Sequence, residues 1–580
     1  MIFCTINELN LAWFILRSVL GRSVYLLALE PLIPSFRPRL ERVIQYFADR
    51  NHVKFAVDIV PQLARYEEGD GEISYAAIYP RHDNIFNQMM QFDSTNLGDY
   101  NQIFRHASGC RLKGHLEKFP PLREMRPIFA DQKIHMQGLP HDFCKMYEAI
   151  YGEPLGSGIG RSRIPRRILN FALTVGIGGA LLFAIIRRLS FAPQRQRAFP
   201  FAADLAEEGR VRSFFNQISV EPTEIVFVLR NPQVRDNLNS KELSRYHHAD
   251  LTEGHFTVRE AITAAISGIR DSINIYMEIS SAPTSTFLGV IKQVVNRIRF
   301  RAFLNCYALG AFMARDEYNT DHITRTQELR RAGTRSVGIL HGMSTGPRVY
   351  PHTRYLDFDT LYLFGRRQSN AYIDNWPDTM VVRALGGYSL TREQIQRLGG
   401  PRSKDIAIFA NQVTDTKEHV RISMAIADHF KDRTIYLKLK YSRNYVGSDL
   451  YQRYMDWLGD LPENLVLMET PPYDLLMDVG YSFSGLSTVV AEALQMGVSS
   501  YFIDTYDDDQ DVFFRDFPAL CIKTAETAIE NIEAIERGEE VYPSEQFGDL
   551  IDLSGDNIFD VIRADLALPP WNDKSNCQAA

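Results

Sequence analysis

The chain has 580 residues, of which 45% are hydrophobic and 23% are charged, and its formal net charge is −7. These values exclude a disordered polymer, a collagen, a coiled-coil rod and a polytopic membrane protein, because the compositions of all four lie outside the globular range. At roughly 100 to 200 residues per domain, the length corresponds to about three or four domain-sized units.

The N-terminal residues have the pattern of a β-α-β unit. Apolar runs at 2–6 and 24–29 predict strands, and the apolar spacing over 9–20 predicts a helix between them. Residues 60–155 show no regular period, so no element is predicted there. The six cysteines show no C-x-x-C spacing, which indicates a reducing compartment and neither a disulfide framework nor a zinc site.

One short segment departs from the average charge. Between Glu153 and Asp204 there is no acidic residue, and eight arginines lie there: Arg161, Arg163, Arg166, Arg167, Arg187, Arg188, Arg195 and Arg197. The rest of the chain, without these eight positive charges, has a formal charge of −15. A basic segment of this kind predicts an anionic partner.

Residues 168–186 form the apolar centre of this segment. They carry no charge, and Asn170 and Thr174 are their only polar residues. The length is close to the roughly 20 apolar residues that a spanning helix needs. Three central glycines and arginines balanced at both ends argue against a simple span and fit a segment that lies in the interface or enters one leaflet. A buried core helix is the alternative.

The expected partner is therefore an anionic membrane surface, with no nucleic-acid partner. We expect the protein at the cytoplasmic face of the membrane, attached in a monotopic or single-pass manner. A full span would place the N-terminal unit and the later units on opposite sides. A monotopic, re-entrant attachment is expected if residues 1–150 belong to the same catalytic lobe as the units that follow.

After the basic segment, apolar runs alternate with helical patterns. Long helices are predicted at 258–279 and 287–309. Strands are predicted at 224–229, 311–314, 336–340, 360–364 and 380–384. Short apolar strands between helices indicate a parallel sheet that is covered on both faces.

A second α/β unit follows two Gly-rich breaks at 386–387 and 399–401. Its predicted strands are 406–410, 434–439, 465–468, 481–483 and 500–503, and its predicted helices are 420–430, 450–458, 473–479 and 487–496. Two such units predict a cleft between them. Open parallel sheets bind ligands at the carboxyl ends of their strands.

The stretch after residue 483 is suited to an anion. Ser484 and Gly485 lead into Ser487 and Thr488 at a helix start, where backbone N–H groups and hydroxyls suit a phosphate. Glu492 lies four residues after Thr488 on the same helix face, where its carboxylate would accept hydrogen bonds from ribose hydroxyls. The alternative is an N-capped helix with a solvated glutamate.

This stretch has S-T-x-x-x-E-A at 487–493, then Gly497 and a strand ending in Asp504. It resembles the donor-nucleotide motif of GT-B glycosyltransferases, especially bacterial transferases of surface and capsular polysaccharide. Residues 465–479 resemble the preceding strand and short helix of that family. Residues 316–342 and 361–365 resemble blocks of its first domain.

The resemblance covers about residues 305 to 510. It implies an α/β fold of two Rossmann-like domains, GT-B-like, around a central cleft, to which the sequence adds a membrane-associated insertion. It also implies a nucleotide-sugar donor as substrate and no tightly bound cofactor.

This chain departs from the family after the second strand of the donor domain, where a His-Pro pair is usual. Here the sequence reads LKLKYSR over 437–443. Lys438, Lys440 and Arg443 are the cations that would neutralise a diphosphate instead. An altered or inactive site is the alternative. Leu340 stands where the family often has Gln.

An inverting transfer needs a base for the acceptor hydroxyl and cations for the departing phosphate. Asp316, Glu317 and His341 are the catalytic candidates, because they fall at predicted strand ends facing the cleft. No metal site is predicted: we interpret the acidic run 507–511 as a solvated loop and the His247-His248 pair as a surface loop.

The predicted organisation has six parts. They are an N-terminal α/β segment of the acceptor-side lobe (1–155), the membrane-associated insertion (156–200), the rest of that lobe (201–387), a linker (388–404), a nucleotide-sugar-binding Rossmann-like domain (405–545) and a C-terminal tail (546–580).

The leading hypothesis is a membrane-associated, metal-independent GT-B glycosyltransferase. It would transfer a sugar from a nucleotide sugar to a lipid-linked or polysaccharide acceptor in surface polysaccharide synthesis. The alternatives are a sugar-nucleotide epimerase of the same build and a catalytically silent GT-B-like scaffold.

Overall fold

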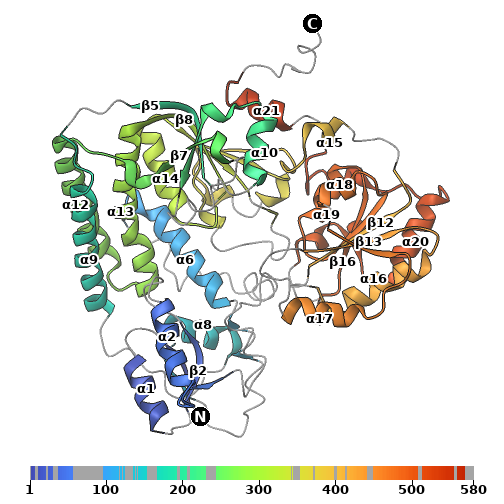
Figure 1. Cartoon of the computed structure of the whole chain (residues 1–580), viewed down its shortest axis with the longest axis horizontal. Coiled ribbons are helices and arrows are strands. Elements are labelled where there is room, and N and C mark those ends of the chain that lie inside the picture. Colours follow the sequence, from blue (N-terminus) through green and yellow to red (C-terminus); the bar gives the residue numbers. More distant parts are fainter. Residues whose placement is uncertain are drawn as a thin grey trace. The chain divides into compact units, whose positions relative to one another are not determined.

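The computed structural model describes most of the chain (Figure 1). The described residues are 2–6, 11–20, 24–29, 37–56, 96–116, 118–119, 122–123, 135–137, 139, 141–152, 166–191, 196–204, 209–229, 243–315, 317–340, 342–343, 353–369, 373–396, 402–411, 415–440, 449–469, 471–506, 512–553 and 558–568.

The chain divides into two compact units. Unit 1 comprises residues 1–193, 256–299 and 349–356, and unit 2 comprises residues 194–255, 300–348 and 357–580. The chain therefore passes between the units several times. The roles assigned to the predicted domains stay predictions.

Unit 1 contains a four-stranded parallel sheet in the order β3-β2-β1-β4. Its strands are β1 (Ile2–Ile6), β2 (Val24–Leu29), β3 (Lys54–Phe55) and β4 (His135–Gln137). Helix α1 (Leu11–Val19) connects β1 to β2, and Phe14 of α1 and Ile44 of α2 (Arg37–Ala48) are buried against the sheet. The predicted β-α-β unit is confirmed.

Among the described residues, two helices of unit 1 lie in the range where no element was predicted. They are α6 (Tyr100–Leu116) and α8 (His141–Tyr151). The apolar centre of the basic segment is α9 (Arg166–Ile186), and it is helical through all three glycines, so no re-entrant turn occurs at them. By length and composition α9 is apolar enough to cross a membrane, and only 22% of its most apolar window is buried. A buried core helix does not fit this low burial.

The first sheet of unit 2 has seven parallel strands in the order β11-β10-β9-β8-β5-β6-β7. The strands are β5 (Arg197–Ala203), β6 (Ile225–Leu229), β7 (His247–Asp250), β8 (Tyr307–Ala314), β9 (Arg335–Ile339), β10 (Thr360–Leu363) and β11 (Val381–Ala384). We call this part the first domain. Helices α12 (Val258–Ile279) and α13 (Thr284–Cys306) precede β8 in the chain.

The structure differs from the predictions at three places in this sheet. Strand β5 was not predicted, because its first residues belong to the arginine-rich segment. Strand β8 begins at Tyr307, where a helix was predicted to continue to 309; the Tyr307 hydroxyl donates to Glu253 at 2.8 Å and its ring stacks on Phe303. His247 and His248 lie in strand β7, not in a surface loop.

The second sheet of unit 2 has six parallel strands in the order β14-β13-β12-β15-β16-β17. They are β12 (Ile406–Ala410), β13 (Ile435–Leu439), β14 (Leu465–Met468), β15 (Tyr481–Ser484), β16 (Ser499–Ile503) and β17 (Cys521–Ile522). We call this part the second domain. All its strands except β17 were predicted within one or two residues.

Helices cover both faces of the second sheet (Figure 1). One core is formed with α16 (Lys417–His429), α17 (Asp449–Leu458) and α20 (Ala525–Glu536). The other is formed with α18 (Pro472–Leu476) and α19 (Val489–Gln495). The strand order is that of a Rossmann-like domain. The predicted fold class, two Rossmann-like parallel α/β domains, is confirmed.

The chain returns to the first domain after the second. Helix α21 (Ile558–Asp565) places Ile558, Phe559 and Ile562 in the core of the first domain, beside α10 (Gly209–Gln217). Arg392 joins this contact, because its guanidinium donates to Gln217 O at 2.7 Å and to Asp560 at 2.9 Å. Part of the predicted C-terminal tail is thus a core helix.

Truncation of Phe559 tests this packing. Phe559 is fully buried, and its ring centroid lies 6.2 Å from that of Phe214. We expect Phe559→Ala to lower the free energy of unfolding by about 3–5 kcal/mol, because a cavity replaces the ring. The matched control is Val541→Ala, at a position that is 90% exposed. Equal thermal midpoints for the two variants would contradict the assignment of α21 to the core.

Candidate functional site

The site is set by the point at which the second sheet reverses its strand order. Strands β12 and β15 are neighbours, and the chain proceeds outward from them in opposite directions. Ligands of open parallel sheets bind outside the carboxyl ends of two such strands. Here these ends are Ala410 and Ser484, so the predicted anion-binding stretch 484–488 lies at the expected edge.

Hydrogen bonds fix residues 484–488 to the end of β12. The Ser484 hydroxyl donates to Phe409 O at 2.9 Å, and the Asn411 amide donates to Leu486 O at 3.3 Å. A side chain at Gly485 would meet Asp415, because a Cβ there would lie 2.4 Å from Asp415 Oδ1. The backbone between the two strand ends is therefore held in one place.

The Thr488 hydroxyl joins the two domains of unit 2. It accepts a hydrogen bond at 3.0 Å from the backbone N–H of Met343, which follows β9 of the first domain. Gly342 is also close, since a Cβ there would lie 3.4 Å from Thr488 Oγ1. Two sequence blocks separated by 145 positions thus meet at one point.

This contact changes the expected helix start. Helix α19 begins at Val489, and Thr488 precedes it without a side-chain cap. The Ser487 hydroxyl accepts from Val489 N at 3.4 Å. The side-chain cap is thus supplied one residue before Thr488, so the capped-helix alternative for this stretch stays open. Binding of phosphate by Ser487 and Thr488 stays a prediction.

Glu492 is buried, not solvated, with 5% of its surface exposed. Its Oε1 accepts from the Tyr473 hydroxyl at 2.8 Å. Gly387, after β11 of the first domain, also borders it: a Cβ there would lie 3.4 Å from Glu492 Oε1, and Gly387 N donates to Gln495 at 2.8 Å. The carboxylate is thus fixed between the two domains.

The two described cations differ in placement. Lys440 follows β13 and is exposed, and its charge lowers the pKa of Asp415, which places it near the β12–β15 edge. Lys438 lies within β13; burial lowers its pKa, and its Nζ donates to Leu439 O at 3.3 Å. Lys440 is therefore the better-placed of the two for a diphosphate. Arg443 lies outside the described residues.

A buried acid–imidazole pair lies under the edge and was missed in the sequence. Asp415 Oδ2 accepts from Asn411 N at 2.7 Å and lies 3.5 Å from Nδ1 of His419. Burial raises the pKa of Asp415 well above its ordinary value, although the Asn411 N–H and Lys440 lower it. Burial lowers the pKa of His419 to about 3. Only the four-residue spacing within a helix start hinted at this pair.

The first domain reverses its strand order between β5 and β8. A small, mainly apolar pocket lies at the carboxyl ends of these strands, with Asp204 and Arg315 in its lining together with Phe214, Met313 and Tyr388. Asp204 is buried and pairs with Arg325 at 3.2 Å.

Of the three catalytic candidates, only Glu317 is among the described residues. It follows β8 and is 4% exposed. Asp316 and His341 lie outside the described residues, although Gly342 and Met343, next to His341, reach Thr488. The catalytic roles stay predictions.

Among the described residues, no group of three His, Cys, Asp or Glu side chains is placed to hold a metal ion. His248 stacks on Phe227 with ring centroids 6.1 Å apart. The acidic run 507–511 lies outside the described ranges.

The chain was compared with known proteins. No protein-family model matches the chain, and no curated protein matches it. Several solved structures are similar. UDP-GlcNAc 2-epimerase from Neisseria meningitidis bound to UDP-GlcNAc is 13% identical, over 64% of this chain and 100% of that one, with a TM-score of 0.38.

Two transferases are also similar. A form of wall teichoic acid polymerase TagF soaked with CDPG is 11% identical, over 69% of this chain and 96% of that one, with a TM-score of 0.36. Thermobaculum terrenum O-GlcNAc transferase is 12% identical, over 88% of each chain, with a TM-score of 0.30. Unit 2 has a GT-B-like fold, and that assignment rests on the strand order of its two parallel sheets.

Asp415→Asn tests whether Asp415 is protonated in the folded protein. The asparagine carbonyl can still accept from Asn411 N, so we expect the substitution to change the free energy of unfolding only slightly near pH 4. Above the unfolded pKa of about 3.9, the unfolded acid loses a proton that the folded acid keeps. Wild-type stability should therefore fall relative to the variant as pH rises, by at most about 1.4 kcal/mol per pH unit.

The measurement is urea unfolding of both proteins at several pH values. His419 is present and buried in both proteins, so its contribution cancels in the comparison. Parallel curves of stability against pH would show that Asp415 is ionised in the fold.

Proposed function

We propose that this protein is a GT-B glycosyltransferase that uses a nucleotide-sugar donor. The observation that carries the proposal is the hydrogen bond from Met343 N to Thr488 Oγ1. It brings the end of β9, which bears the acceptor-side motif, to the edge of the second sheet, which bears the donor-side motif. A transfer reaction needs both substrates at one such junction.

Each donor group has a complementary side chain at this junction. We assign the diphosphate to the backbone and hydroxyls of residues 484–488 with Lys440, because N–H donors and a cation favour negative charge. We assign the ribose hydroxyls to Glu492, whose carboxylate is oriented by Tyr473. The sugar then lies toward the first domain.

The chemistry is a displacement at the anomeric carbon. The acceptor oxygen forms a bond to that carbon while the bond to the nucleotide diphosphate breaks. A base removes the acceptor proton, and Glu317, Asp316 and His341 are the candidates. Lys440 stabilises the negative charge that develops on the departing diphosphate, so we propose a reaction that is metal-independent at this step.

We propose a lipid-linked or polysaccharide acceptor at a membrane surface on the cytoplasmic side. The support is α9, whose uncharged sequence is bounded by arginines and mostly exposed. A sugar nucleotide is soluble, so a membrane-binding helix is expected for the acceptor and not for the donor.

A nucleotide panel with product analysis tests the function. Saturation-transfer NMR with CMP-, UDP- and GDP-sugars should identify one donor. Transfer to an acceptor should follow with that donor. Binding with epimerised donor as the only product would instead identify an epimerase, and no binding at all would identify a silent scaffold.

Glu492→Ala should weaken donor affinity about tenfold or more, because a charged hydrogen-bond acceptor for the ribose is lost. Titration calorimetry with the donor found in the panel measures it. Glu530→Ala is the matched control, since Glu530 is an exposed glutamate on α20 of the same domain. Unchanged affinity in Glu492→Ala would refute the ribose assignment.

Thr488→Val keeps the side-chain shape and removes the hydroxyl that accepts from Met343 N. We expect kcat to fall about tenfold or more, since closure of the two domains around the substrates loses this contact. Thr527→Val, at an exposed position on α20, should behave as wild type. Wild-type kcat in Thr488→Val would contradict the proposed junction.

A further inference from the structure

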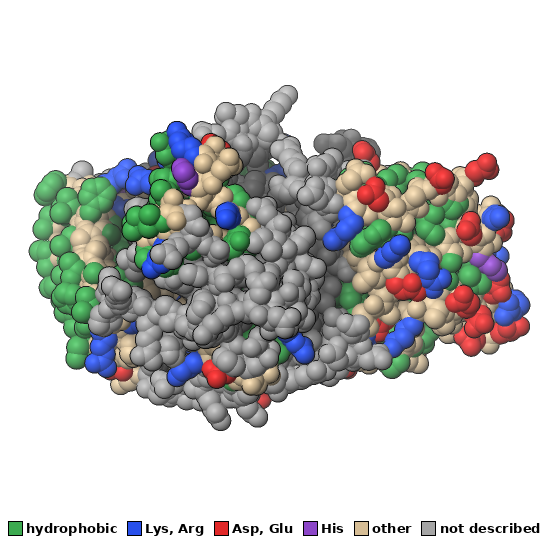
Figure 2. Space-filling model, turned by 90° about the horizontal axis from the view of Figure 1, so that it is seen from below, with side chains coloured by type: hydrophobic (Ala, Val, Ile, Leu, Met, Phe, Trp, Pro, Cys, Tyr) green, Lys and Arg blue, Asp and Glu red, His purple; other side chains and the backbone are tan. Residues whose placement is uncertain are grey.

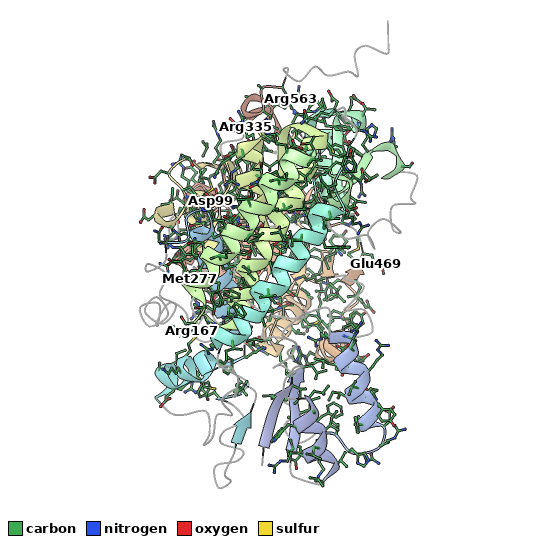
Figure 3. The ribbon with its side chains drawn as sticks, turned by 90° about the vertical axis from the view of Figure 1, so that its left-hand side faces the viewer. Asp99, Arg167, Met277, Arg335, Glu469 and Arg563 are labelled. Carbon is green, nitrogen blue, oxygen red and sulfur yellow. The ribbon has the colours of Figure 1, made fainter. Side chains whose placement is uncertain are left out.

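Helices α9 and α12 of unit 1 form a firmly joined antiparallel pair (Figure 3). At one end, the Asn170 amide donates to Ser280 O at 2.9 Å and to Ala282 O at 3.1 Å. At the other end, Ser190 N donates to Phe256 O at 2.9 Å and Phe256 N donates to Arg188 O at 2.8 Å. Both ends of α9 are thus tied to the ends of α12.

The middle of the pair is closely packed. Leu181 of α9 is fully buried, and a Cβ at Gly268 of α12 would lie 2.6 Å from its Cδ2. A side chain at position 268 would therefore require Leu181 to move. The contacts between α9 and α12 therefore run from one end of the pair to the other.

The outer face of α9 is wholly apolar. The two polar side chains between its flanking arginines lie away from this face: Asn170 is fully buried, and Thr174 is half-buried with its hydroxyl donating to Asn170 O at 2.8 Å. The large side chains point outward, with exposed fractions of 44–65%: Ile168, Phe171, Val175, Leu182, Phe183 and Ile186.

Helix α12 continues this outer face. Its large apolar side chains recur every three or four residues and are 43–71% exposed: Val258, Ile262, Ile266, Ile269, Ile273 and Met277. Its buried side consists mainly of small residues, Ala261, Ala264, Gly268 and Ser272, and is completed by Ile275 and Ile279 near its end. We call the two sets of exposed side chains the α9–α12 face. Figure 2 shows hydrophobic side chains gathered at the left-hand edge, where these helices lie.

This distribution is opposite to that of a helix in water, where large apolar residues face the core. Small residues between helices and large residues outward are typical of helices in a lipid environment. A contiguous apolar surface of this extent is also rare on a monomeric soluble protein. The packing of the pair therefore indicates lipid as the medium around its outer face.

The charges that border the face are cationic. Arg167 and Arg187 are exposed at the two ends of α9, and Arg259 and Arg270 are exposed on α12 beside the apolar stripe. The acids of α12 lie elsewhere. Glu260 and Glu278 fall almost half a turn from the centre of the stripe, and Asp271 accepts from the Tyr100 hydroxyl at 2.9 Å.

We propose that the α9–α12 face embeds in one leaflet of an anionic bilayer, with both helices parallel to the membrane plane. The pair, about 30 Å long by helix rise, would insert its isoleucines and phenylalanines among acyl chains. The bordering arginines would contact lipid phosphates. This inference deepens the proposed function and rests on its membrane attachment.

A spanning orientation conflicts with the packing. Helix α12 carries Arg259, Glu260, Arg270, Asp271 and Glu278, so it cannot cross the hydrocarbon layer. Helix α9 could cross only by leaving α12, which would expose the Asn170 amide and its carbonyl partners to lipid.

A second copy of the same chain is a poorer occupant than lipid. Arginines stand at both ends of α9, so a two-fold pairing of this face would bring arginine against arginine in either orientation. Anionic headgroups complement the same charges.

Vesicle binding tests the proposal with matched variants on one helix. Ile266→Glu and Ile273→Glu place a charge within the face, whereas Thr263→Glu and Asn274→Glu place it on the exposed polar side of α12. With vesicles of phosphatidylglycerol and phosphatidylcholine, the first two variants should bind about tenfold or more weakly. The other two should bind like wild type. Equal losses in all four would overturn the proposal.

Lipid charge is tested separately. Wild type should bind vesicles of pure phosphatidylcholine more weakly than anionic vesicles, and Arg167→Glu with Arg187→Glu should remove that difference. Indifference of the wild-type protein to lipid charge would contradict the role of the arginines.

Depth measurements distinguish the orientation. A bimane label on an introduced cysteine at Ile168, Val175 or Ile186 should be quenched by shallowly brominated lipid to the same extent, with the unsubstituted protein as the background. Deep quenching at Val175 with shallow quenching at the two ends would show a span and overturn the in-plane arrangement.

Light scattering without lipid measures the oligomeric state and tests whether a second copy covers the α9–α12 face. A dimer that Ile266→Glu converts to monomer would identify a second copy as the occupant and overturn the lipid assignment.

Nucleotide-sugar binding is measured on the same variants. Lost vesicle binding with retained nucleotide binding supports the face, whereas vesicle binding without any nucleotide binding refutes only the transferase.

Discussion

The rule that orders unit 2 is the direction of its strands. All paired strands in both of its sheets are parallel, so every carboxyl end in a sheet lies on the same edge. Loops that leave that edge can be short and still bring together residues far apart in sequence. The contact between Met343 and Thr488 is one result, and the placement of Gly387 against Glu492 and Gln495 is another. The proposed transfer depends on this convergence.

Two buried titratable groups lie beside this edge in the second domain, and burial disfavours the charged form of each. Asp415 and His419 are both fully buried, with pKa shifts in opposite directions, and each shift favours the uncharged form. A neutral Asp415 can hold Asn411 without the desolvation cost of a buried charge. Asn411 in turn donates to Leu486, within the predicted phosphate-binding stretch. We therefore expect the local stability of the donor edge to depend on this buried pair.

Much of the fold could be predicted from local pattern, because the strands of the second domain are short apolar runs between helices. Residues 406–410 and 465–468 were predicted to the residue. Strand β5 was missed because its Arg197 continues an arginine-rich segment, and only its neighbours β6 and β8 make it a central strand. Helix α21 was missed because its core partner, Phe214, is far away in sequence.

In the candidate site, too, features set by local sequence could be predicted and features set by distant contacts could not. The stretch 484–488 and Glu492 could be proposed from the sequence because a strand, a Gly and a helix start follow one another in the chain. The burial of Glu492 was not predictable, since Tyr473 and Gly387 come from other elements. The outward stripe of α12 was also hidden: an apolar period indicates that a helix has an apolar face, but not whether protein or lipid covers it. Only the burial of the opposite side, mainly small residues with Ile275 and Ile279, shows which side packs against protein.

The most direct test of the account is hydrogen–deuterium exchange with and without a nucleotide-sugar donor. The account predicts slower exchange on binding in peptides that cover 435–440 and 481–495, and in the peptide that covers 335–343 of the first domain. Protection that spares all three, under conditions where the donor is shown to bind, would place the nucleotide elsewhere and contradict the proposed junction.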